Sequence, residues 1–134
     1  MELKQILESA LQLGGSDVFI IPGSKVMAKV RGNMVPLCEE RVMPEESRSL
    51  ISQAYALAQN RDIGRIYDDG DDDFSFSVEK MCRFRCNAYQ QRGTLAATFR
   101  GSSRIFRVFI PFLLILPKNW LPVHIWSMTI RMPF

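Results

Sequence analysis

Residues 83–100, RFRCNAYQQRGTLAATFR, constrain the fold more than any other stretch of the chain. Apolar and polar side chains alternate on both sides of a Gln-Arg-Gly segment, which is typical of strands with one buried face. The stretch therefore predicts two antiparallel strands joined by a turn. The residues expected to face the core are Phe84, Cys86, Ala88, Leu95, Ala97 and Phe99.

The register of this hairpin follows if apolar residues pair with apolar residues. It places Arg83 opposite Arg100 and predicts a four-residue loop over 90–93. Arg85 would lie on the same polar face, with Arg92 in the loop. Like charges directly opposite one another destabilise a pair of strands, so this arginine cluster needs an anion nearby.

Two interpretations of the cluster stay open. In the first, Asp71, Asp72 or Asp73 partly neutralises a solvated sheet face. In the second, the anion is a phosphate, because the planar guanidinium group suits bidentate phosphate binding.

The rest of the chain predicts an α+β fold, in which helices pack against a largely antiparallel sheet. Apolar residues at helical spacing predict one helix over 2–13 and a second from Pro44, where proline suits the first helical position. A short helical turn is expected over 61–67. The remaining predicted strands are 17–21, 25–32, 34–37 and 73–78.

The composition changes sharply after residue 100. All fourteen acidic residues lie between Glu2 and Glu79, whereas residues 101–134 hold both tryptophans and four of the seventeen basic residues. The first hundred residues sum to a charge of −1 and the rest to +4. We therefore expect a single domain at 1–100, followed by an atypical acid-free tail at 101–134.

Three interpretations of the tail compete. It is a membrane or interfacial segment, an element packed on the domain, or the product of out-of-frame translation, without ordered structure. The apolar run 108–117 is about half the roughly 20 residues that a spanning helix needs. Its prolines disfavour a regular element. A frameshift near codon 100 best explains why every acid is lost at one boundary.

Three motifs, GGSDVFI (14–20), DFSFSV (73–78) and RFRCNAYQQRG (83–93), precede a strand that ends in arginine. Together they resemble the N-terminal PAS-like domain of the PilT family of type IV pilus retraction ATPases, in the secretion-ATPase superfamily. The resemblance covers nearly all of residues 1–100, and its third motif is the most specific. Phe19 stands where the family usually has histidine, and Gly15 where alanine is common.

The resemblance implies a domain that packs against a RecA-like ATPase domain and neighbouring subunits in a hexameric ring. Such a ring drives twitching motility from the cytoplasm, peripheral to the inner membrane, and acts indirectly on the pilus platform, without nucleic acid. Arginines of the domain would reach toward the phosphates of ATP, bound with magnesium in the ATPase domain. By position, the candidates are Arg83, Arg85, Arg92 and Arg100.

The chain itself lacks the Gly-x-x-x-x-Gly-Lys-Ser/Thr loop, and no carboxylate follows Glu79 to serve as a Walker B residue. We therefore expect no ATPase activity, catalytic residue or cofactor in this chain. The acidic run 68–73 is expected to be a solvated loop and not a metal site. Ser16 and Asp17 are expected to cap or turn the chain.

Two alternatives from other functional classes remain. A free-standing PAS-like binding module is compatible with the same fold, because fold does not fix function. A small membrane-associated protein anchored by its tail would follow from the first interpretation of residues 101–134.

Overall fold

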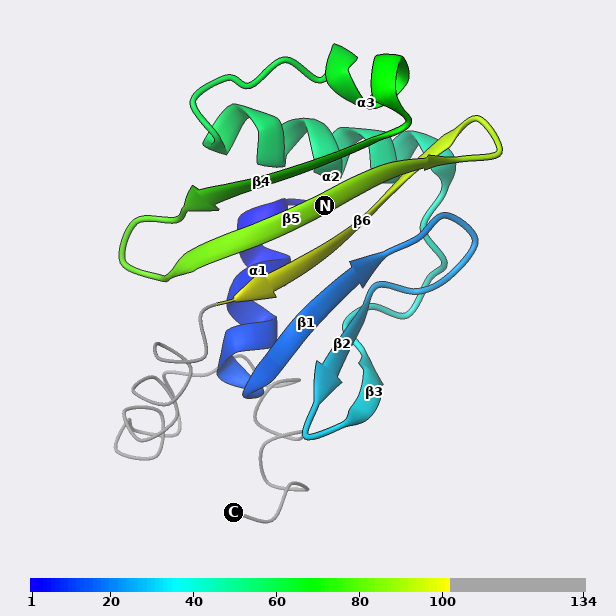
Figure 1. Cartoon of the computed structure of the whole chain (residues 1–134). Coiled ribbons are helices and arrows are strands. Elements are labelled where there is room, and N and C mark those ends of the chain that lie inside the picture. The colour runs from blue at the N-terminus through cyan, green and yellow to red at the C-terminus, as the bar shows by residue number, and fades with distance from the viewer. Residues whose placement is uncertain (102–134) are drawn as a thin grey trace.

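The computed structural model describes residues 1–101 and shows one antiparallel sheet with helices along one face (Figure 1). The helices are α1 (Leu3–Gln12), α2 (Pro44–Leu57) and α3 (Gly64–Asp69). The strands are β1 (Gly15–Ile20), β2 (Met27–Val30), β3 (Asn33–Pro36), β4 (Asp71–Ser77), β5 (Arg83–Gln91) and β6 (Thr94–Gly101). Within the described residues the strand order is β3-β2-β1-β6-β5-β4. The predicted α+β class is confirmed.

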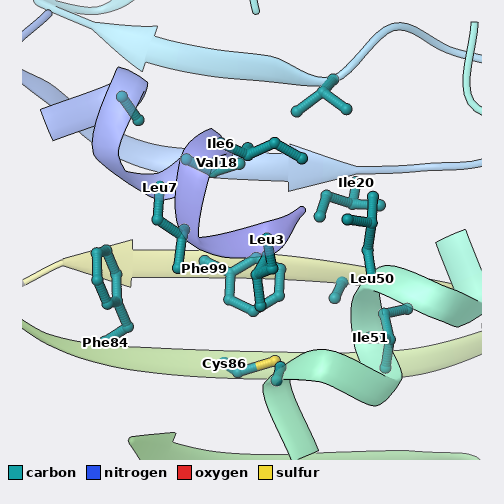
Figure 2. Close-up of a cluster of buried hydrophobic side chains, with 14 of the residues drawn as sticks. Leu3, Ile6, Leu7, Val18, Ile20, Leu50, Ile51, Phe84, Cys86 and Phe99 are labelled. Carbon is teal, nitrogen blue, oxygen red and sulfur yellow. The ribbon is translucent and has the colours of Figure 1, made fainter. Parts of the chain in front are cut away.

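The core lies between the sheet and the helices α1 and α2, which pass behind the strands in Figure 1. Leu3 and Leu7 of α1 are fully buried, as are Ile51 of α2 and Phe99 of β6. Figure 2 shows these side chains gathered in one cluster with Cys86 of β5. Burial of such side chains contributes about 1.5–3 kcal/mol each, so the face of the sheet toward the helices holds the domain together.

The helix boundaries follow from local chemistry. Helix α1 ends before Gly14, whose φ of 76° is a backbone conformation that favours glycine. Helix α2 begins at Pro44, as predicted, and the Glu46 carboxylate accepts a hydrogen bond from the Met43 backbone N–H. The helical turn expected over 61–67 is α3, which starts three residues later and ends at Asp69.

The predicted register of the β5–β6 hairpin is wrong by two residues. Arg85, and not Arg83, lies opposite Arg100, and the loop is the two-residue turn Arg92-Gly93 instead of residues 90–93. A shift of two keeps the same residues on the apolar face, so alternation alone does not distinguish the two registers. The turn geometry determines the register. Both turn residues have positive φ (51° and 80°), as a two-residue turn that matches the twist of the flanking strands requires.

The tail falls outside the described residues, apart from Gly101 at the end of β6. The three interpretations of residues 101–134 therefore stay predictions. Among residues 1–101, no helix has the length and apolar character needed to cross a membrane.

Candidate anion-binding site on the open face of the sheet

The sheet face opposite α1 and α2, here the open face, is turned toward the viewer in Figure 1 and carries no helix among the described residues. One row of neighbours crosses it from β1 to β4: Asp17, Arg100, Arg85 and Ser75. The next row contains Thr98, Asn87 and Asp73. The alternation in the sequence thus places Arg85 and Arg100 side by side, facing away from the core.

Each of these two arginines bonds to a carboxylate on its outer side. Arg85 donates from Nε and Nη2 to the two oxygens of Asp73, at 3.1 and 2.6 Å. Arg100 donates from Nε to Asp17 Oδ1 at 2.9 Å. The two acids offset the repulsion expected between like charges on neighbouring strands. The interpretation in which Asp73 partly neutralises the cluster is therefore confirmed.

Asp17 is the partner that the sequence interpretation missed. It was expected to cap or turn the chain, but it lies in β1 and pairs with Arg100 across the β1–β6 ladder. The two residues are 83 positions apart, and no local pattern indicates which strand lies beside β6. The one available signal is an acidic residue inside an otherwise apolar strand sequence, because a carboxylate that a sheet buries needs a partner.

A shallow hollow of about 220 Å³ lies among the two ion pairs and is open to solvent. Asn87 and Thr98, which are cross-strand neighbours in the row next to the arginines, also line it. Neither side chain forms a hydrogen bond with another residue of 1–101, so an amide and a hydroxyl are available to a ligand. The hollow therefore combines two guanidinium groups and two neutral donors, which suit an oxyanion, with the carboxylates of Asp17 and Asp73, which would compete with it.

Arg83 and Arg92 are not part of this hollow. Arg83 donates to Ser75 Oγ (2.7 Å) and Ser77 Oγ (3.3 Å) on β4. Arg92 lies at the tip of the hairpin, where it lines a separate, mainly apolar depression with Met43. Of the four arginines predicted from the resemblance, Arg83, Arg85 and Arg100 lie on the open face, and the hollow is lined by Arg85 and Arg100.

The Arg85–Asp73 pair is charged at neutral pH. Hydrogen bonding to Arg85 lowers the pKa of Asp73 below its usual value, and the same bonds raise the pKa of Arg85. Both side chains are well exposed, at 72% for Arg85 and 45% for Asp73. Exposed pairs of this kind are weak and are screened by salt, so a competing anion can replace the carboxylate.

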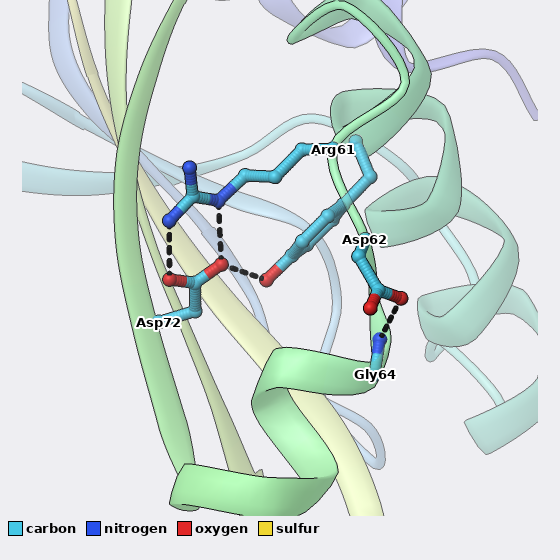
Figure 3. A network of polar contacts seen from close by, with 5 residues as sticks. Arg61, Asp62, Gly64 and Asp72 are labelled. Atoms are coloured by element: carbon cyan, nitrogen blue, oxygen red, sulfur yellow. Dashed lines mark hydrogen bonds and ion pairs between the residues drawn. The ribbon is translucent and has the colours of Figure 1, made fainter.

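Asp72 belongs to a different network on the helix side of β4 (Figure 3). Its Oδ2 accepts from Tyr55 Oη (2.7 Å) and Arg61 Nε (2.8 Å), and its Oδ1 accepts from Arg61 Nη2 (2.9 Å). Arg61 also lies over the Phe74 ring, 5.3 Å from its centre. Asp72 therefore does not neutralise the arginine cluster. Its hydrogen bonds connect β4 to Tyr55 of α2 and to Arg61 in the segment that follows α2.

The acidic run 68–73 is not the loop that the sequence predicts, because Asp68 and Asp69 end α3 and Asp71 already begins β4. Asp72 and Asp73 are on opposite faces of β4, and the Asp71 side chain forms no hydrogen bond or ion pair with another residue of 1–101. No group of three or more acidic, histidine or cysteine side chains in residues 1–101 is arranged to hold a metal ion.

Comparisons with known proteins agree with the fold and with the length of the resemblance. No protein-family model matches the chain. The type IV pilus ATPase PilU of Pseudomonas aeruginosa is 29% identical over 100 residues, which are 75% of this chain and 25% of PilU. The crystal structure of the pilus retraction motor PilT with bound ADP matches 75% of this chain and 29% of that one, at 30% identity and a TM-score of 0.65. The N-terminal three quarters of this chain is homologous to PilT and PilU.

Two further structures share the fold. The ATPase DotB of Legionella pneumophila has a TM-score of 0.58 at 24% identity, and DotB of Yersinia pseudotuberculosis has 0.55 at 18%. They cover 73% and 74% of this chain. The predicted sheet with packed helices is therefore the fold of the PilT N-terminal domain. The chain spans about a quarter of the length of PilU.

Proposed function

We propose that residues 1–101 act as the N-terminal domain of a PilT-like motor ATPase, and that Arg85 and Arg100 contact the phosphates of a nucleotide held by an ATPase domain. The observation that carries this proposal is the placement of the two arginines as direct neighbours on the open face of a PilT-homologous domain. PilT itself was crystallised with ADP.

The chemistry of the hollow fits this role. Charge that develops on a transferring phosphoryl group is stabilised by arginine, whose donors match the phosphate oxygens in pairs. Asn87 and Thr98 supply neutral donors in the row of side chains next to Arg85 and Arg100. Arg83 and Arg92 stay candidates for phosphate or subunit contacts. Arg83 lies on the same open face but outside the hollow, beside Ser75, whereas Arg92 would act from the tip of the hairpin.

Hydrolysis, in this proposal, belongs to an ATPase domain outside this chain. The relatives are ATPases, and the chain matches about a quarter of PilU. Its sequence contains no Gly-x-x-x-x-Gly-Lys-Ser/Thr loop. We propose that ATP and magnesium are bound by the ATPase domain, that the partners are this domain and neighbouring subunits, and that the assembly works in the cytoplasm beside the inner membrane.

Titration of the full 134-residue chain with tripolyphosphate, a mimic of the nucleotide phosphates, tests the phosphate contact. Nuclear magnetic resonance of the arginine Nε–H groups reports on each side chain separately. Tripolyphosphate should shift the signals of Arg85 and Arg100, and Arg100→Ala should weaken binding severalfold because one charged donor pair is lost. Arg48→Ala is the matched control, since Arg48 is an exposed residue of α2. Unchanged binding after the loss of both Arg85 and Arg100 would overturn the proposal.

A further inference from the structure

We infer that the two carboxylates of the open face act on anion binding in opposite directions: Asp17 positions Arg100 for the anion, whereas Asp73 competes with the anion for Arg85. This inference rests on the proposed function and adds to it a means of setting the affinity of the site. It follows from a difference in burial, and in the number of bonds, between the two ion pairs.

Asp17 is held on both of its oxygens. Its side chain is only 8% exposed, and Ser16 Oγ donates to its Oδ2 at 2.7 Å while its Oδ1 accepts from Arg100 Nε. Arg100 bonds to Asp17 through Nε alone, and its two terminal nitrogens form no hydrogen bond with residues 1–101. Because the guanidinium group is planar, a fixed Nε directs the remaining donors. Asp17 thus orients Arg100 and leaves its terminal donors available.

Asp73 holds Arg85 in a different way. It takes two donors of Arg85, Nε and Nη2, which form the edge that a phosphate would use for bidentate binding. Its side chain is far more exposed than that of Asp17, so water and ions reach the pair. An anion that binds Arg85 in this manner must first displace Asp73.

Charge alone predicts a different result. Removal of either carboxylate makes the open face more positive, and Coulomb attraction would then strengthen anion binding in both cases. If Asp17 instead positions Arg100, the two removals have opposite effects on affinity. Without Asp17, Arg100 loses its fixed orientation and must be ordered by the ligand itself, which weakens binding. The sign of the Asp17 effect therefore separates the two explanations.

The experiment titrates the full chain and four variants with tripolyphosphate. Asp73→Ala should tighten binding roughly threefold, as expected for the loss of one weak competing ion pair. Asp17→Ala should weaken binding by roughly the same factor. Asp17→Asn keeps an acceptor for Arg100 Nε and should bind at least as tightly as the wild type. Asp71→Ala, which removes a charge of the same strand, should change affinity by less than about 1.5-fold.

The wild type supplies a second readout that does not depend on whether a variant folds. On binding, the Nε–H signal of Arg85 should move more than that of Arg100, because only Arg85 exchanges its Nε partner. Equal movement of both signals would overturn the inference, as would tighter binding in both alanine variants. Those results would leave the arginine contact intact. A wild type that does not bind tripolyphosphate would instead overturn the proposed function, and the inference with it.

Discussion

Arg85 lies directly opposite Arg100 in the β5–β6 ladder, so two side chains of like charge are cross-strand neighbours. This arrangement does not favour stability, because like charges in such positions repel. Asp17 and Asp73 offset the repulsion from either side, and they line the hollow together with both arginines. We propose that these charges serve a ligand more than they serve the stability of the fold.

Replacement of Arg85 by threonine should separate these two roles. The variant loses an exposed ion pair and a repulsion together, so its melting temperature should stay within about 2 °C of the wild type. Its affinity for tripolyphosphate should fall severalfold. Thermal unfolding followed by circular dichroism measures the first quantity. A fall in melting temperature of ten degrees would show that the arginine serves the fold.

The network around Asp72, in contrast to Arg85, should contribute to the stability of the fold. Asp72→Ala removes the shared acceptor of Tyr55 and Arg61 and leaves both donors without it, which should lower the free energy of unfolding by about 1–3 kcal/mol. Tyr55→Phe removes a single hydroxyl and should cost about 1 kcal/mol. Urea denaturation of the two single variants and the double variant measures the coupling. Additive effects would contradict a shared network.

Low pH should lower the free energy of unfolding of the domain, because it protonates Asp72. The pKa of Asp72 is lowered, first by its hydrogen bonds from Arg61 and also by the Tyr55 hydroxyl, with burial opposing. A carboxylate with a depressed folded-state pKa stabilises the fold above its unfolded value of about 3.9, and this stability is lost as the pH falls through the lower, folded value. Stability should therefore drop below about pH 4 in the wild type, and less in Asp72→Asn. Urea midpoints between pH 7 and pH 2 test this; parallel curves for the two proteins would contradict it.

The sequence predicts which face of the sheet a side chain lies on better than it predicts which residue lies opposite it on the next strand. The alternation in residues 83–100 placed Arg85 and Arg100 on the polar face, because side-chain direction depends only on parity. It gave the wrong partner for Arg100, because a two-residue slip preserves parity and the turn geometry decided the register. The Asp17–Arg100 pair depends on the order of strands in the sheet, which short-range patterns do not encode.

The reading frame beyond codon 100 gives a prediction that needs only DNA. The loss of every acid after Glu79, together with the end of the resemblance at Arg100, favours a frameshift. A shift by one or two nucleotides near codon 100 should restore an Ile-Pro linker and then, within about a hundred codons, a strand, a phosphate-binding loop and a helix. If neither alternative frame encodes such a loop, the frameshift interpretation fails.

We propose that this domain serves a PilT-like motor through Arg85 and Arg100. A chimera that joins residues 1–100 to the remainder of PilU allows ATP hydrolysis by the assembled protein to be measured. Arg100→Ala should lower kcat at least tenfold, as expected for an arginine that stabilises phosphoryl transfer, while Arg48→Ala should leave it unchanged. Full activity after the loss of both Arg85 and Arg100 would show that these arginines do not act in hydrolysis.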